Sequence, residues 1–350
     1  MRRVVSGEAR CARESGKRKV AAGSSRRFRI PLSAALCAAF VLAPPPLLAQ
    51  GTVRTDTLWS QSLGTSKAVV VYLPPSYGRE PARRYPVAYY LHGHWGAETD
   101  WTRQGALARA MDSLAAAGAP EMIVVMPDGD DGWYTTWNAL GTYRGCMRDP
   151  LPGGRTEPHE TYCVPWPKYD DYVARDVVAF VDSGYRTLPG AAHRGIAGLS
   201  MGGYGAITLA LAYPDVFSAA WSHSGYLDTM LLDSAGTTRE ARSIEELRER
   251  HRGTWYSLGP AFGEDTIGWR ARDPATLVRR ALARGALPAI GFDVGRDDPF
   301  LERNRAFART LDSLGVRHQY AEHAGRHDWV YWRARLPESA TWLAGHIAAP

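Results

Sequence analysis

Short hydrophobic runs recur along the chain after Gln50, and stretches with apolar residues at helical spacing separate them. The runs are rich in β-branched residues and predict strands at 67–73, 86–91, 121–126, 194–199, 217–222, 288–294 and 316–322. The spacing of the intervening stretches predicts helices at 104–117, at 169–185 and around 307–314. Because nearly continuous apolar strands are buried on both faces, the pattern predicts one α/β domain with a mostly parallel sheet between helices.

One region, residues 225–273, interrupts this alternation. It contains the charged sequence "TTREARSIEELRERHRGTW" and has no strand signal, although predicted strands lie on either side of it. We interpret it as a helical insertion over the edge of the sheet, near the site described below. The alternative is a peripheral decoration without function.

The positive charge of the chain is concentrated at its N-terminus. The chain has 42 Lys and Arg residues and 36 Asp and Glu residues. Residues 1–49 contain ten of the basic and two of the acidic residues, which leaves 32 basic and 34 acidic residues in the remainder. A body with a net charge of −2 lacks the basic surface expected of a nucleic-acid-binding protein, so we expect no nucleic-acid partner.

The basic N-terminus has the organisation of an export signal. After Arg29 comes the apolar run "IPLSAALCAAFVL", and "APPPLLAQ" offers a cleavage site after Ala49. The run is short for a membrane span. We therefore predict a signal peptide at 1–49, a catalytic domain at 50–350 and an exported protein without stable membrane insertion after cleavage; a permanent N-terminal anchor is the alternative.

Cleavage of this leader would remove Cys11 and Cys37 and leave Cys146 and Cys163. Two cysteines 17 residues apart in an exported chain predict one disulfide that closes a loop. Two free buried thiols are the alternative.

A serine flanked by glycines, in "RGIAGLSMGGYGA", lies where a predicted strand ends and a helix begins. A turn this sharp strains the backbone of Ser200, and Gly198 and Gly202 remove side chains that would collide there. The hydroxyl is then exposed beside the backbone N–H of Met201 at the helix N-terminus. This is the arrangement of a serine nucleophile with an oxyanion donor.

A serine nucleophile needs a base and an orienting acid, in the chain order Ser, acid, His for this kind of turn. The loop after strand 288–294 holds Asp297 and Asp298, and the loop after strand 316–322 holds His323 and His327. His327 is the better candidate for the base because a glycine turn precedes it. Either aspartate could be the acid.

The second oxyanion donor should come from the loop after strand 86–91, which reads "HGHWG". Gly93 allows the backbone to turn its amides inward, and the N–H of His94 is the expected donor.

Four blocks in this order, "YLHGHWG", "VVMPDGDDGWYTTW", "GLSMGGYGA" and "GRDDPFLERNRAF…GRHDWVYW", resemble the esterase D family of α/β hydrolases. That family includes S-formylglutathione hydrolases, feruloyl and acetyl-xylan esterase domains, and mycolyltransferases. The resemblance covers residues 69–343. It implies an α/β-hydrolase fold with Ser200 as nucleophile, Asp298 as acid, His327 as base, and the amides of His94 and Met201 as oxyanion donors.

The resemblance also implies that Trp133, Tyr134 and Trp137 lie by the acyl pocket, although from the residues alone they could equally be core. The chain departs from the family pattern in the cysteine segment 145–164 and in the insertion 225–273. Substrate selectivity would be set in these two regions, so no particular member's substrate can be carried over.

We therefore predict a serine carboxylic-ester hydrolase that acts through an acyl-enzyme on a small-molecule or carbohydrate ester, without cofactor or metal. An acyltransferase of the mycolyltransferase type would use the same triad, and a non-catalytic carbohydrate-binding protein could keep the fold. A metal-dependent hydrolase is a further alternative, because His92 and His94 alternate while His323 and His327 are four apart. The second pair encloses a glycine and has no helical pattern, which disfavours a metal site.

Overall fold

The computed structural model describes residues 50–137, 143–234 and 237–348. Residues 47–350 form one compact unit. The predicted signal peptide, with Cys11 and Cys37, lies outside the described residues. Among the helices that the structure does describe, none combines the length and the apolar character needed to cross a membrane.

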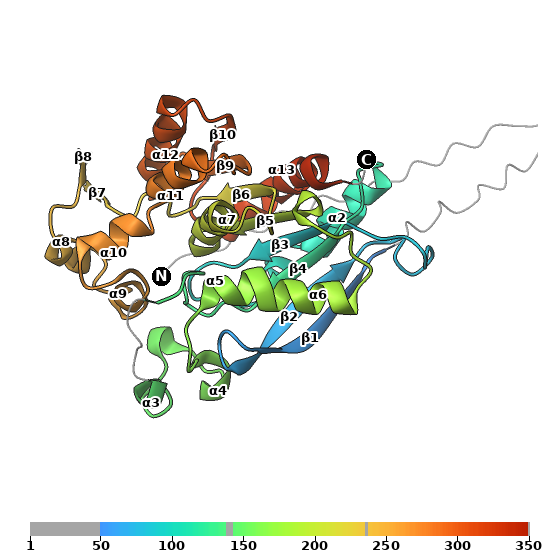
Figure 1. Cartoon of the computed structure of the whole chain (residues 1–350), viewed down its shortest axis with the longest axis horizontal. Helices are drawn as coiled ribbons and strands as arrows, with labels where there is room; N and C mark the ends of the chain where they lie inside the picture. The colour runs from blue at the N-terminus through green and yellow to red at the C-terminus, as the bar shows by residue number, and fades with distance from the viewer. Residues whose placement is uncertain (1–49, 138–142, 235–236, 349–350) are drawn as a thin grey trace, which may run out of the picture. The chain divides into compact units, whose positions relative to one another are not determined.

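An eight-stranded sheet forms the centre of the unit, in the order β1-β2-β4-β3-β5-β6-β9-β10 (Figure 1). Strand β2 pairs antiparallel with β1 and β4, and the strands from β4 to β10 pair in parallel. The bounds are β1 Thr52–Ser60, β2 Thr65–Leu73, β3 Val87–Leu91, β4 Ile123–Pro127, β5 Arg194–Leu199, β6 Ala219–His223, β9 Ala289–Gly295 and β10 His318–His323. The prediction of a mostly parallel sheet is thus confirmed, and each of the seven predicted strands is present.

In the central sheet, the strand that sequence analysis missed is β1. It forms the edge of the sheet, and most of its residues are exposed or half-buried. Because it packs few side chains into the core, its sequence "TVRTDTLWS" lacks the continuous apolar run that identifies the central strands.

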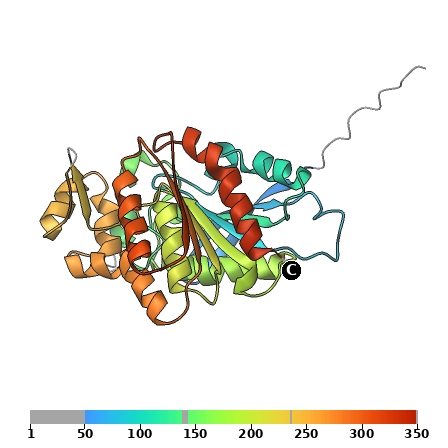
Figure 2. The ribbon, with the colours of Figure 1, turned by 90° about the horizontal axis from the view of Figure 1, so that it is seen from above.

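Helices cover both faces of the sheet, and each face has its own apolar core (Figures 1 and 2). One core contains residues of α6, α7, α11 and α12, and the other contains residues of α2 and α13. The bounds are α1 Asp100–Arg103, α2 Leu107–Ala116, α3 Tyr143–Cys146, α4 His159–Tyr162, α5 Tyr169–Asp171, α6 Val178–Gly184, α7 Met201–Ala212, α11 Pro274–Ala283, α12 Leu301–Ser313 and α13 Trp329–Ile347. A π-helical turn, Tyr172–Val177, joins α5 to α6, so the helix predicted at 169–185 is present as one continuous stretch.

The sequence suggested that the insertion 225–273 is helical, but the structure shows that only part of it is. It contains α8 Ile244–Arg250, α9 Trp255–Phe262 and α10 Thr266–Ala271, but also a hairpin of β7 Leu231–Ser234 and β8 Thr237–Glu240. The prediction that this region has no strand is therefore wrong. The hairpin forms a separate two-stranded sheet with four residues in each strand, too short to give a hydrophobic run in the sequence.

Candidate active site

Ser200 occupies the sharp turn between β5 and α7, with φ 54° and ψ −116°. The turn brings backbone segments so close that a Cβ on Gly198 would lie 2.3 Å from the carbonyl oxygen of Gly202. The N–H of Ser200 donates to the carbonyl oxygen of His223, at the end of β6, over 2.9 Å. The strained conformation is thereby held by the neighbouring strand, and the half-buried hydroxyl projects from the turn.

A continuous hydrogen-bonded chain links Ser200, His327 and Asp298. The Oγ of Ser200 lies 2.9 Å from Nε2 of His327, and Nδ1 of His327 lies 2.8 Å from Oδ2 of Asp298. The Asp298 side chain is fully buried, and its Oδ1 accepts the N–H of Phe300 over 2.8 Å. With Nδ1 protonated toward the carboxylate, Nε2 is free to accept the serine proton.

The other candidates for acid and base lie elsewhere. Asp297 is exposed and joins its neighbours through its backbone N–H, which donates to the carbonyl oxygen of Gly325. His323 is the last residue of β10, and its Nε2 lies 3.5 Å from a carboxylate oxygen of Glu338.

Two backbone amides, those of His94 and Met201, belong to residues next to the turn at Ser200. Gly93 packs against the serine, since a Cβ on this glycine would lie 3.4 Å from Cβ of Ser200, and His94 follows directly. Met201 begins α7. In the part of the chain that the structure describes, neither the His94 nor the Met201 N–H donates to a protein acceptor. Two unused donors beside a nucleophile can bind an oxyanion.

The His94 side chain contacts the insertion, a feature that sequence reasoning missed. Its Nε2 lies 2.9 Å from Oγ of Ser257 in α9, and its ring packs against Trp95, Trp133 and Tyr256. Burial lowers the pKa of His94, so the imidazole is neutral near pH 7. The insertion therefore supports the loop that carries one of the two free amides.

The three aromatic residues predicted to lie by the acyl pocket have different environments. Trp133 and Tyr134 are 5% and 1% exposed and belong to the main core. Trp133 also donates through Nε1 to Ser257 Oγ over 3.2 Å. Trp137 is half-buried and lines a cavity of about 380 Å³, together with the disulfide and Tyr256.

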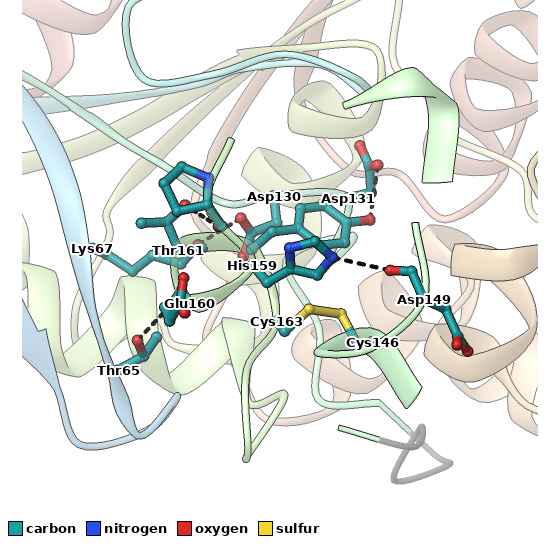
Figure 3. Close-up of a disulfide and its surroundings, with 12 residues drawn as sticks. Thr65, Lys67, Asp130, Asp131, Cys146, Asp149, His159, Glu160, Thr161 and Cys163 are labelled. Carbon is teal, nitrogen blue, oxygen red and sulfur yellow. Dashed lines mark hydrogen bonds and ion pairs between the residues drawn. A yellow bond between two sulfur atoms is a disulfide. The ribbon is translucent and has the colours of Figure 1, made fainter. Parts of the chain in front are cut away.

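A disulfide joins Cys146 to Cys163, with a Cα–Cα distance of 5.7 Å (Figure 3). The prediction of a disulfide is thus confirmed. The bond closes the segment between α3 and α4, which lies beside the loop that follows β4.

Beneath that segment, one buried lysine forms ion pairs with two carboxylates. Lys67 Nζ lies 2.5 Å from Asp130 and 3.1 Å from Asp128, and it also donates to the carbonyl oxygen of Thr161 (Figure 3). Burial raises the pKa of Asp130 to about 7 despite the lysine, whereas Lys67 and His92 outweigh burial and lower the pKa of Asp128. The single lysine sits in an otherwise apolar predicted strand, and nothing in the sequence indicated its partners.

The Esterase family model, described as "Putative esterase", matches residues 60–343 of the chain. Esterase Rv1288 of Mycobacterium tuberculosis is 28% identical over 281 residues, covering 77% of this chain and 54% of that protein. An acetyl esterase of Caldicellulosiruptor saccharolyticus is 24% identical over 257 residues, covering 73% and 82%. The chain thus spans about half the length of the mycobacterial relative.

Solved structures share the fold. A ferulic acid esterase superimposes with a TM-score of 0.63 at 27% identity, covering 85% of this chain and 98% of that one. An S-formylglutathione hydrolase of Agrobacterium tumefaciens superimposes with a TM-score of 0.60 at 20% identity, covering 88% and 99%. Together with the family match over most of its length, these likenesses show that the chain belongs to the esterase D-like family of α/β hydrolases.

Proposed function

We propose that this protein is a serine carboxylic-ester hydrolase. The observation that carries the proposal is the hydrogen-bonded chain from Asp298 through His327 to Ser200. Family membership and the esterases among its relatives support the same reaction class.

In the proposed first half-reaction, Oγ of Ser200 attacks the ester carbonyl carbon while its proton passes to Nε2 of His327. The N–H groups of His94 and Met201 bind the oxyanion that forms, and Asp298 stabilises the imidazolium. The bond to the alcohol oxygen then breaks, and His327 protonates that oxygen. The acyl group remains on Ser200 as an ester.

In the second half-reaction, water attacks this acyl-enzyme, and His327 accepts a proton from the water. As the second oxyanion collapses, the bond from the acyl carbon to Ser200 Oγ breaks and His327 returns its proton to that oxygen, which releases the carboxylic acid and restores the serine hydroxyl. Water can reach the site because the His327 side chain is 23% exposed and Ser200 is half-buried. This exposure favours hydrolysis over acyl transfer to a second alcohol.

The proposed substrates are esters of small molecules or carbohydrates, by analogy with the acetyl and ferulic acid esterases among the relatives. We further propose that the protein is exported, since the N-terminal sequence has the pattern of a signal peptide and the chain forms a disulfide.

The proposal is tested with p-nitrophenyl esters of increasing acyl length, beside feruloyl and acetylated-sugar esters, with and without a fluorophosphonate. We expect hydrolysis that the fluorophosphonate abolishes and that a metal chelator leaves intact. Activity lost in chelator but retained after fluorophosphonate treatment would contradict the serine mechanism.

A further inference from the structure

We propose that Arg155 and Asp131 position the oxyanion loop, defined as residues 92–96, and that the disulfide-closed segment 146–163 exists to hold Arg155 in place. The inference rests on the proposed ester hydrolysis. It assigns a role to the cysteine segment, whose purpose the sequence left open.

The Asp131 carboxylate holds the oxyanion loop through a hydrogen bond to its backbone. It is buried after β4, and its Oδ1 accepts the backbone N–H of Trp95 over 2.8 Å. Trp95 directly follows His94, whose N–H is the proposed oxyanion donor. A displacement of the Trp95 peptide therefore changes the direction of the neighbouring donor.

Arg155 connects that carboxylate to the end of the same loop. Its Nη2 donates to Asp131 Oδ1 over 3.0 Å and to the carbonyl oxygen of Gly96 over 3.2 Å, while its Nε lies 3.2 Å from Oδ2. The Arg155 side chain is only 11% exposed. Burial raises the pKa of Asp131, but the charge and hydrogen bonds of Arg155 and the hydrogen bond from the Trp95 N–H oppose this effect; the pKa is lowered overall, and the carboxylate stays charged. A planar guanidinium holds both partners in one fixed fork geometry, which the point charge of a lysine ammonium does not reproduce.

The closed segment adds further contacts with the loop. Tyr162 donates to Asp131 Oδ2 over 3.2 Å and stacks against the Arg155 guanidinium. Gly153, at φ 70°, lies so close to the Trp95 ring that a Cβ would be 2.8 Å from it. The disulfide, which joins the two ends of the segment, and the hydrogen bond from Lys67 to the Thr161 carbonyl oxygen fix the chain around these contacts (Figure 3).

The insertion completes the arrangement from the other side. Tyr256 donates to Asp131 Oδ2 over 2.9 Å and accepts from Nε1 of Trp95 over 3.0 Å. Both regions that depart from the family pattern thus converge on one carboxylate behind the oxyanion loop. The geometry points to a shared positioning role rather than to two unrelated decorations.

A positioning role has a kinetic signature that a purely structural role lacks. An oxyanion donor acts on the transition state and contributes little to binding of the ester itself. Misplacing it should lower kcat while KM stays nearly constant. For Arg155→Met we expect kcat to fall about 10- to 100-fold, less than for outright loss of a donor.

The test compares Arg155→Met, Arg155→Lys and the control Arg148→Met, with kcat expressed per active site titrated by a fluorophosphonate. Arg148 lies in the same closed segment but is exposed, and among the described residues its side chain pairs only with neighbouring Asp149. We expect the control to match the wild type and Arg155→Lys to recover part of the loss, because it restores the charge without bridging Asp131 and Gly96. Wild-type kcat in titrated Arg155→Met would overturn the proposal.

Should Arg155→Met fail to fold, Asp131→Asn replaces it, since the amide keeps the volume and an acceptor for Trp95 but loses the ion pair. Unchanged kcat in that variant would equally overturn the proposal. These outcomes differ from failure of the proposed function, in which the wild-type protein itself neither hydrolyses esters nor reacts with the fluorophosphonate.

Discussion

Two regions meet at the candidate site, and they are built in different ways. Ser200, Asp298 and His327 follow the carboxyl ends of parallel strands β5, β9 and β10. The position of each side chain is set mainly by the strand and the turn that carry it. The support of the oxyanion loop instead uses side chains from irregular segments, joined through Asp131. The first region should therefore tolerate substitution without unfolding, whereas the second should lose activity and stability together.

The largest effect is expected for Ser200→Ala. The hydroxyl contributes chemistry and little packing, so ester hydrolysis should fall by at least about 10⁴-fold while the melting temperature stays unchanged. Ser183→Ala, on the exposed face of α6, is the matched control. Residual turnover of more than a few per cent in purified Ser200→Ala would remove the serine from the mechanism.

The second effect separates two adjacent aspartates. Asp298→Asn should lower kcat about 10³- to 10⁴-fold, because the amide cannot hold the His327 tautomer that accepts the serine proton. Asp297→Asn should leave kcat nearly unchanged, because its side chain is exposed. Its free energy of unfolding should stay within about 0.5 kcal/mol of the wild-type value. Steady-state kinetics and melting curves measure both, and the reverse ranking would move the acid to Asp297.

Removal of the disulfide tests the second region. A Cys146→Ser, Cys163→Ser double variant should lose about 3 kcal/mol of stability in the chain-entropy model and should also show a reduced kcat. Chemical denaturation and kinetics well below the melting temperature separate the two losses. A destabilised variant with full kcat would show that the bond serves stability alone.

The effect with the least bearing on activity is a pH dependence of stability. Asp130 faces Lys67, Asp128 and the Tyr169 hydroxyl, and burial raises its pKa to about 7. The folded state then binds a proton that the unfolded state has released above about pH 4. The contribution of Asp130 to stability is therefore present at low pH and is lost as pH rises toward about 7, by up to about 1.4 kcal/mol per pH unit.

Asp130→Asn removes this titration. The difference in unfolding free energy between wild type and Asp130→Asn should therefore change between pH 4 and 7 and be flat above about pH 8. A difference that is constant across this range would show that Asp130 is ionised throughout.

The sequence was most informative where backbone geometry decides. A serine between glycines at a strand end, and polar residues in the loops after two later strands, sufficed to predict which elements bring Ser200 and His327 together. The choice of Asp298 over Asp297 came from the family resemblance and stays a prediction; in the structure the Asp298 carboxylate is buried and contacts His327.

Side-chain contacts between distant segments could not be read in this way. Asp131 and Arg155 are 24 residues apart, and Tyr256 contacts Asp131 across 125 residues. No periodicity relates such positions, since their contact depends on how irregular loops fold back on the sheet. The same reason explains why the residues alone left Trp133 open between core and pocket; in the structure it belongs to the main core.

The most direct test of the central claim is to trap the acyl-enzyme. The protein is mixed with a p-nitrophenyl ester, quenched in acid within the first turnovers and examined by intact-protein and peptide mass spectrometry. The account predicts one acyl group per chain, carried by the peptide that contains Ser200 and absent from Ser200→Ala. Turnover of the ester without any adduct, or an adduct on another residue, would contradict it.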